Sequence, residues 1–180
     1  MNMKKVLVFA GSNSSTSINQ KLAKYASTLL KDVSCTVIEL RDYPAPVFSE
    51  DLEKEVGYPE TLKALNELFK EHDGFIISLP EYNSSVTPVF INTVDWISRI
   101  ESPTFKDKPV LLLSTSNGAR GAMTNLANVE SLMPRWGGIV TGTYSLRSFS
   151  ENYSNESGMI TNVAEIDRLK TLVQTFESEV

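Results

Sequence analysis

Hydrophobic positions along the chain fall into two kinds of block with different periods. Five short runs are nearly continuous in Val, Ile, Leu and Phe: Val6–Ala10, Thr36–Leu40, Phe75–Leu79, Val110–Thr115 and Ile139–Thr143. Continuous apolar runs of this length are typical of strands that are buried on both faces of a parallel sheet. The chain therefore has five candidate strands for one sheet.

Five other segments repeat apolar residues every three or four positions, which is the period of an amphipathic helix. The apolar faces are Ile18, Leu22, Tyr25 and Leu29; Leu62, Leu65, Leu68 and Phe69; Phe90, Val94 and Ile97; Ala122, Leu126, Val129 and Met133; and Ile166, Leu169, Val173 and Phe176. Helix starts are signalled by Gly57-Tyr58-Pro59, Thr87-Pro88 and Thr161-Asn162. Strand and helix alternate five times, which predicts an α/β fold: a five-stranded parallel sheet in three layers, with helices on both faces.

No internal repeat and no linker-like break interrupts this alternation, so we predict one domain over residues 1–180. Two stretches have no clear period, Asp42–Gly57 and Ser145–Gly158, and we expect long loops there. The second loop is rich in Ser, Asn and Glu, which fits either a solvated excursion or a lid or interface segment.

Charge and cysteine content exclude several classes of protein. Seventeen basic and 22 acidic residues give a net charge of −5, which argues against a nucleic-acid partner. One cysteine and one histidine cannot form an internal disulfide or a zinc site of nitrogen and sulfur ligands, so we predict no metal. The run Val6–Ala10 is too short for a signal peptide, and no stretch reaches the roughly 20 apolar residues of a membrane span. We expect a cytoplasmic protein without a membrane partner.

Ligands of open α/β sheets bind beyond the carboxyl ends of the strands, where the strand order reverses. Three segments rich in small and polar residues occupy that place: the first loop, Gly11–Asn19, the second loop, Pro80–Pro88, and the third loop, Ser114–Ala122. His72 and Cys35 instead come just before strands, at the opposite edge. A Ser-His-Asp or Cys-His hydrolase is therefore not expected, because its nucleophile and base must lie within about 3 Å of each other.

Phosphate binding is the chemistry that the first loop favours. Gly11 allows a tight turn out of the strand, five hydroxyl residues follow between Ser12 and Ser17, and the next helix starts near Ser17. Free N–H groups and the positive end of the helix dipole attract an anion at such a place. The loop matches neither GxxxxGK[ST] nor GxGxxG. A serine-rich capped turn without a ligand would show the same pattern.

The other two loops suit a planar heterocycle. The segment Pro80-Glu81-Tyr82-Asn83-Ser84-Ser85 offers an aromatic face, an amide and backbone donors, while Gly118 and Gly121 allow close backbone approach to a ring edge. A plain turn before the helix at Pro88, and a plain helix entry in the third loop, are the alternatives.

Together the three loops resemble the NAD(P)H-dependent FMN reductase family. The family's first loop, GSxRxxSxN, is matched within Gly11–Asn19, and its PEYN motif is matched in full at Pro80–Asn83. A stretch similar to its KNAIDWLSR appears at Ile91–Arg99, and one similar to its SxGxxGG at Ser116–Ala122. The similarity runs from residue 4 to about residue 145, and PEYN in register with the downstream N-x-x-D-W is its most specific part.

The resemblance implies a doubly wound, flavodoxin-like fold with strand order 2-1-3-4-5 and bound FMN. It also implies NADPH or NADH as co-substrate, a small-molecule electron acceptor, ping-pong kinetics, and a homodimer or tetramer with the helix of Trp96 near the interface. No protein side chain is then needed as a catalyst, because the flavin carries the chemistry. The residues implied to bind the cofactor are Ser12, Ser14, Ser17, Ile18, Asn19, Pro80, Glu81, Tyr82, Asn83, Ser84, Ser116, Gly118, Arg120 and Gly121.

One position departs from the family pattern: Ser14 stands where the family has the arginine of its first loop. The loss of this cation predicts weaker FMN binding that depends less on salt. We further expect Arg120 to lie either near the pyrimidine edge of the flavin or near a phosphate of NAD(P)H, or else to be an exposed arginine at a helix start. Two other functions stay open: a flavodoxin-like electron carrier without enzymatic activity, and a binding module that lacks the flavin.

Overall fold

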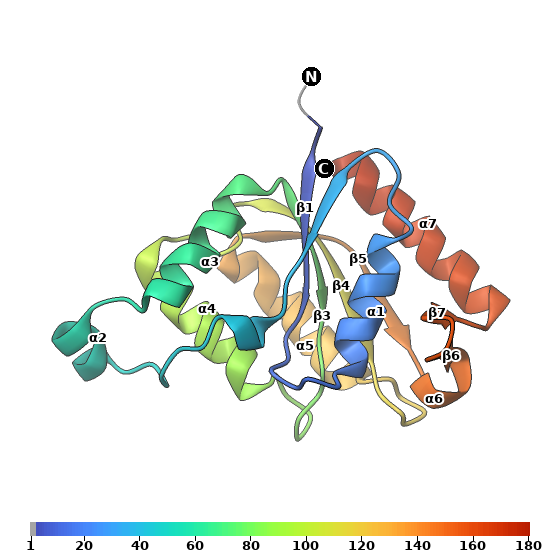
Figure 1. The fold of residues 1–180 in the computed structure, drawn as a ribbon, viewed down its shortest axis with the longest axis horizontal. Helices are drawn as coiled ribbons and strands as arrows, with labels where there is room; N and C mark the ends of the chain where they lie inside the picture. Colours follow the sequence, from blue (N-terminus) through green and yellow to red (C-terminus); the bar gives the residue numbers. More distant parts are fainter. Residues whose placement is uncertain (1–2) are drawn as a thin grey trace.

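A computed structural model describes residues 3–180. Its centre is a parallel sheet in the order β2-β1-β3-β4-β5 (Figure 1). The strands are β1 (Lys5–Ala10), β2 (Ser34–Val37), β3 (Gly74–Ser78), β4 (Lys108–Thr115) and β5 (Gly138–Leu146). The α/β class, the five parallel strands and the flavodoxin-like order 2-1-3-4-5 are therefore confirmed.

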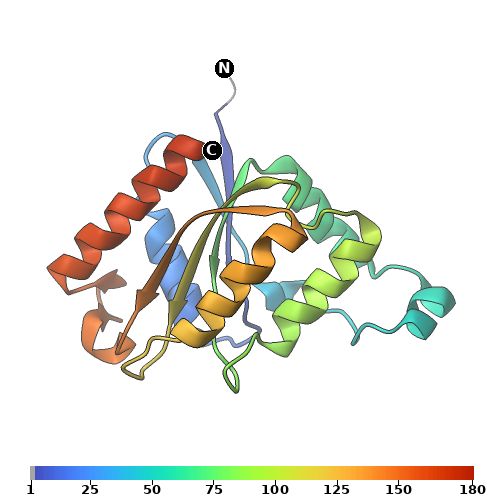
Figure 2. The ribbon, with the colours of Figure 1, turned by 180° about the vertical axis from the view of Figure 1, so that it is seen from behind.

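Helices cover both faces of this sheet, as the two opposite views in Figures 1 and 2 show. One face carries α1 (Ile18–Ser27) and α7 (Val163–Glu179); the other carries α3 (Glu60–Glu71), α4 (Pro88–Ile100) and α5 (Met123–Leu132). Successive residues of a strand point to opposite faces. In β1, for example, Leu7 packs with the second group of helices and Val8 with the first, and both are fully buried. This two-sided burial explains the continuous apolar runs of β1, β3 and most of β4. The expectation is wrong for the two edge strands, because all four residues of β2 are exposed and Ile139 of β5 is 56% exposed.

Side-chain caps begin three of these helices where the sequence predicts. The Oγ of Ser17 accepts a hydrogen bond from Gln20 N at the start of α1, and Thr87 caps α4, with Pro88 in its first turn. Asn162 accepts from Ala164 N and Glu165 N at the start of α7. Each cap satisfies backbone donors that the first helical turn leaves free, so these local signals predict boundaries well.

The second strand lies two residues earlier than predicted. β2 spans Ser34–Val37 rather than Thr36–Leu40, and Leu40–Asp42 form the 3₁₀ helix η1. The Gln20 side chain donates from Nε2 to Ile38 O at 2.9 Å and accepts from Ala10 N at 2.9 Å. The amide of this α1 residue therefore links the carboxyl ends of β1 and β2. Ile38 N still donates to Val8 O of β1 at 3.0 Å, but Ile38 O bonds to a side chain, and the pairing of the two strands ends there. Cys35 consequently lies inside β2, not just before it.

Both segments expected as long loops contain regular structure. Within Asp42–Gly57 the helix α2 (Glu50–Val56) protrudes from the body at the left of Figure 1, and none of its residues is buried. Within Ser145–Gly158 the end of β5 is followed by α6 (Phe149–Asn152) and by β6 (Tyr153–Ser154), which pairs with β7 (Met159–Ile160). The solvated excursion is therefore the wrong alternative for the second segment, because two of its aromatic side chains, Phe149 and Tyr153, are buried.

Trp96 on α4 is fully buried in the core and donates from Nε1 to Pro46 O at 2.8 Å, so it holds the segment before α2 against α4. The 3₁₀ helix η2 (Met133–Trp136) links α5 to β5.

Within residues 3–180, no helix has both the length and the apolar character needed to cross a membrane. The same residues contain no group of three His, Cys, Asp or Glu that could hold a metal ion.

Candidate functional site

The first, second and third loops meet beyond the carboxyl ends of β1, β3 and β4, at the lower edge of the sheet in Figure 1. They enclose a pocket of about 270 Å³, which we call the cofactor pocket. Nine of the predicted site residues line it. The whole lining is Ser12, Ser14, Thr16, Ser17, Ile18, Asn19, Pro80, Glu81, Tyr82, Thr115, Ser116 and Asn117.

Hydroxyl groups and the start of α1 form one side of the cofactor pocket. Ser12 Oγ accepts from Ser14 N at 3.2 Å, and the hydroxyls of Ser14 and Thr16 lie 3.3 Å apart. Among the described residues, no acceptor bonds the backbone N–H groups of Ile18 and Asn19 in the first turn of α1. Unpaired N–H groups and the positive end of the helix dipole together favour an anion at this place.

No lysine or arginine lines the cofactor pocket. The one charged side chain in its lining is Glu81, whose Oε2 accepts from Asn125 N at 2.9 Å, in the first turn of α5. A carboxylate is stabilised by the positive end of a helix, so this contact holds the second loop against α5. The bond from Asn125 Nδ2 to Pro80 O, at 2.7 Å, adds a second tie. An anion in this pocket is therefore bound by neutral donors.

Asn19 connects three elements below the pocket floor. It is 3% exposed, and its Oδ1 accepts from Ser78 Oγ at 2.8 Å and from Thr115 N at 3.1 Å. Its Nδ2 donates to Thr115 O at 3.1 Å. Because both ends of the amide are engaged, the Asn19 side chain positions β3 and β4 against α1, while its backbone N–H faces the pocket side of the helix start.

The second loop ends in a tight two-residue turn. Tyr82 and Ser85 exchange two backbone hydrogen bonds of 3.0 Å, and between them Asn83 and Ser84 have φ of 51° and 61°. Asn tolerates this left-handed conformation better than most residues, which explains its presence at the tip. Tyr82 lines the pocket and is 49% exposed. The structure does not bring the side chains of Asn83 and Ser84 into the pocket.

The third loop contributes Ser116 and Asn117 to the pocket, whereas Gly118, Arg120 and Gly121 lie outside its lining. Gly121 has φ of 59°, and a Cβ on it would stand 2.3 Å from Ser145 Oγ. Its lack of a side chain therefore permits close packing against the end of β5. Arg120 is exposed, as expected for a simple helix-start arginine.

Three pocket residues were missed by the sequence reasoning: Thr16, Thr115 and Asn117. All three lie in the loops that the strand-end rule selects, so that rule could have found them. They were passed over because neither a motif nor a family pattern marks them.

His72 and Cys35 lie at the opposite edge of the sheet, as predicted. His72 is 3% exposed, and its ring nitrogens bond to Leu68 O at 2.7 Å and Thr36 Oγ1 at 2.8 Å. Partial burial and the nearby Glu177 raise the pKa of the Cys35 thiol, which disfavours the reactive thiolate. Neither residue is placed to act in the cofactor pocket.

Several known proteins are similar to this chain in sequence. Residues 4–151 match the family described as NADPH-dependent FMN reductase. The chain is 40% identical over 76 residues to a quinone reductase of Escherichia coli, covering 42% of this chain and 40% of that one. It is 33% identical over 118 residues to an NAD(P)H-dependent FMN reductase of Pseudomonas aeruginosa, covering 65% and 62%. The matches thus span less than two thirds of these curated relatives.

A solved structure agrees over nearly the whole chain. The flavoenzyme NAD(P)H:(acceptor) oxidoreductase FerB of Paracoccus denitrificans superposes with a TM-score of 0.83 and 25% identity, covering 98% of this chain and 97% of that one. The matched region of the family includes all three loops of the cofactor pocket. The chain belongs to the NADPH-dependent FMN reductase family.

Proposed function

We propose that the protein is an FMN-dependent oxidoreductase that uses NAD(P)H to reduce a small-molecule acceptor. The observation that carries this proposal is the set of unpaired donors at the start of α1, which opens into a pocket formed by the three family loops. Family membership and the likeness to NAD(P)H-dependent flavoenzymes support the same conclusion.

The residues present fit the phosphate end of FMN. The N–H groups of Ile18 and Asn19 point out of the first turn of α1, and the hydroxyls of Ser12, Ser14 and Ser17 lie beside them. The terminal oxygens of a phosphate accept hydrogen bonds from such donors. The charge would be balanced by the helix dipole alone, because no cationic side chain lines this pocket.

The opposite side of the pocket fits a flat ring system. Pro80 and Tyr82 supply apolar and aromatic surface, and Ser116 and Asn117 supply polar groups. Glu81 and Asn125 fix the position of this wall through their bonds across the loop. We infer that Tyr82, whose ring is half exposed, also limits access of water and of the second substrate.

When bound, FMN supplies the redox chemistry, because its ring system accepts a hydride from a nicotinamide and passes electrons to an acceptor. The chain's own part is to bind, to orient and to leave one side of the pocket open. Ping-pong kinetics are part of the proposal, since one open side serves NAD(P)H and the acceptor in turn. The acceptor is a flavin, a quinone, an azo compound or a similar small molecule.

The wider setting also belongs to the proposal. We propose one FMN-binding domain over residues 1–180, a homodimer or tetramer, and a cytoplasmic location. Light scattering tests the oligomeric state: a dimer or tetramer is expected, and a monomer would contradict the proposed assembly.

The absorption spectrum of the purified protein, followed by anaerobic reduction with NADH and NADPH, tests the function. We expect the visible bands of a flavin after loading with FMN, and their bleaching within the dead time or the first seconds of mixing with a nicotinamide. A protein that takes no FMN would contradict the proposal and favour a binding module. A loaded protein that neither nicotinamide reduces would instead favour an electron carrier.

A further inference from the structure

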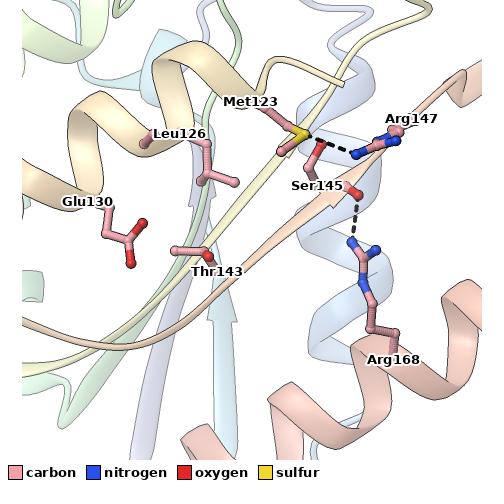
Figure 3. A pocket seen from close by; sticks show the side chains of 8 residues that line it. Met123, Leu126, Glu130, Thr143, Ser145, Arg147 and Arg168 are labelled. Atoms are coloured by element: carbon pink, nitrogen blue, oxygen red, sulfur yellow. Dashed lines mark hydrogen bonds between the residues drawn. The ribbon is translucent and has the colours of Figure 1, made fainter. Parts of the chain in front are cut away.

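A second pocket lies on the other side of the third loop, at the open edge of the sheet (Figure 3). Its volume is about 210 Å³, and we call it the Arg147 pocket. It is formed by α5, β5 and α7. Its lining is Met123, Leu126, Ala127, Glu130, Thr143, Ser145, Arg147 and Arg168. No feature of the family motifs points to it, since most of these residues lie outside the matched loops.

One wall of this pocket is a stripe along α5. Met123, Leu126, Ala127 and Glu130 are spaced three, four and seven positions from the first, so they share one helical face. The stripe is about 10 Å long, at 1.5 Å per residue. It is apolar over its first turn, from Met123 to Ala127, and ends one turn later in the Glu130 carboxylate.

Arg147 lies at the opposite end of the pocket from Glu130 (Figure 3). Its Nη2 is 3.4 Å from Met123 Sδ, which is a weak acceptor. Across residues 3–180 no carboxylate comes within 4 Å of the Arg147 guanidinium. Its charge and most of its donors are therefore unmatched by the protein.

Arg168 of α7 is held rigidly beside the pocket. Its Nη2 donates to Ser145 O at 2.8 Å, and its guanidinium carbon lies 4.4 Å from the centre of the Tyr144 ring. Glu165 stands 3.5 Å from its Nη1 and offsets part of the charge. Burial raises the pKa of Tyr144, so its ring remains a neutral face for the cation. These contacts leave Arg168 half exposed on the pocket side.

The backbone links this pocket to the cofactor pocket. Gly121 O accepts from Ser145 Oγ at 2.8 Å, and Ser148 N, next to Arg147, donates to Gly118 O at 3.2 Å. Phe149 N donates to Ser116 O at 3.0 Å, and Ser116 lines the cofactor pocket. The third loop, which lines the cofactor pocket, is thus hydrogen-bonded to the end of β5 and to the residues that follow Arg147.

We propose that the Arg147 pocket binds an organic anion, with a phosphate or carboxylate on Arg147 and an apolar or aromatic body along the α5 stripe. Arginine pairs well with both groups because its planar fork matches two oxygens. The volume is below the roughly 300–1,000 Å³ of pockets that enclose a whole drug-sized ligand, so the pocket takes a small acid or one end of a larger molecule. Glu130 at the far end favours a ligand that carries a hydrogen-bond donor there.

The ligand we assign is the charged part of the second substrate, which rests on the proposed function. Two sources share this chemistry: a phosphate of the dinucleotide, or the carboxylate of an acidic acceptor. The hydrogen bonds between the third loop and the residues around Arg147 support either source, because they connect the surroundings of the two pockets.

Direct titration tests the site whether or not the proposed function holds. Adenosine 2′,5′-bisphosphate and methyl red, an azo dye with a carboxylate, are titrated into the purified protein by calorimetry. We expect at least one to bind, and Arg147→Ala to weaken it by about tenfold or more, as for the loss of a charge-assisted pair. Glu130→Gln should tighten the same probe by about two- to threefold, because it removes an opposing charge.

Lys170→Ala is the matched control. Lys170 is an exposed cation on α7, two residues from Arg168 and outside the lining, so its loss should leave both affinities within about twofold. FMN uptake, followed by fluorescence, should be equal in all four proteins. No probe binding, equal binding to wild type and Arg147→Ala, or an equal loss in Lys170→Ala would overturn the site.

Steady-state kinetics then separate the two sources. If the KM for NADPH rises in Arg147→Ala while the KM for NADH is unchanged, the group bound at Arg147 is a phosphate of the dinucleotide. A KM that rises for methyl red but not for uncharged 4-(dimethylamino)azobenzene identifies the acceptor. Unchanged KM values for both nicotinamides and both azo compounds would overturn the assignment to the second substrate. A protein that never takes up FMN would contradict the proposed function while the calorimetric result still stands.

Discussion

Two pockets on either side of the third loop are built for anions in opposite ways. The cofactor pocket has no cationic side chain in its lining and offers backbone N–H groups and hydroxyls at the start of α1. The Arg147 pocket offers two guanidinium groups on side chains at the edge of the sheet. The first is fixed by the core of the fold, because Asn19 ties its floor to β3 and β4.

This difference shows which kind of pocket suits a ligand that stays bound and which kind suits a ligand that must leave. Backbone donors in a rigid loop need little ordering when a ligand binds, and they act at short range. Exposed guanidinium groups act over a longer range but are screened by salt and lose side-chain freedom on binding. A permanently held cofactor suits the first kind of pocket, and a substrate that must leave suits the second.

The largest expected effect comes from changing the third loop where it packs against the end of β5. Gly121→Ala places a Cβ 2.3 Å from Ser145 Oγ at a residue with φ of 59°, so the loop must shift. We expect a loss of about 2–4 kcal/mol in the free energy of unfolding, from overpacking and backbone strain combined. Thermal or chemical denaturation measures it.

Gly118→Ala is the matched control for this prediction. Its added Cβ would meet only Ser116 Oγ, at 3.6 Å, and its φ is not positive. Its stability should change by less than about 0.5 kcal/mol. Equal losses in the two variants would show that Gly121 has no special place between the pockets.

A smaller effect is expected from giving the cofactor pocket a cation. Ser14→Arg restores the charge that the family has at this position, beside the start of α1. FMN should bind about tenfold more tightly at low salt, and this gain should shrink as salt rises. Fluorescence titration of FMN measures both. Unchanged or weaker binding would argue against placing the phosphate at the first loop.

Salt alone should separate the two pockets in the wild-type protein. Raising salt from about 0.01 M to about 1 M shortens the Debye length from about 30 Å to about 3 Å. The affinity for FMN should change by no more than about threefold, while anion binding at Arg147 should weaken by about tenfold. Parallel titrations at the two salt concentrations check this. An equal loss of affinity for both ligands would contradict the proposed difference between the two pockets.

The smallest effect is expected at Arg120. The sequence places this residue in the third loop, but its exposed side chain lies outside the lining of both pockets. Arg120→Ala should therefore change kcat and KM for NADH and NADPH by less than about twofold. A large rise in KM for one nicotinamide would instead show that Arg120 reaches the substrate.

Local signals explain why much of the fold could be predicted. Caps at Ser17, Thr87 and Asn162 act within three or four residues of themselves, and buried strands show continuous apolar runs. The second strand was shifted because its end depends on Gln20, which bonds to it from another element. The helix α2 is not predicted because it spans only seven residues and carries just two apolar ones, Leu52 and Val56, which is too short a pattern to show a helical period.

The site residues also fall into those that a local signal predicts and those that depend on distant parts of the chain. Nine of fourteen predicted residues line the cofactor pocket, because the strand-end rule and the motifs act within single loops. Asn83, Ser84 and Gly121 lie outside the lining of this pocket, and their positive φ values belong to the turn and to the packing of the third loop, so their contact with a ligand stays a prediction. The Arg147 pocket could not be predicted, because it joins α5, β5 and α7, whose residues are far apart in the sequence.

The central claim is that backbone donors and hydroxyls at the start of α1 hold the phosphate of FMN. The most direct test compares FMN with riboflavin, which lacks only the phosphate, by fluorescence titration at low and high salt. We predict that FMN binds at least about tenfold more tightly and that this ratio persists at high salt. Equal affinities for FMN and riboflavin would contradict the account.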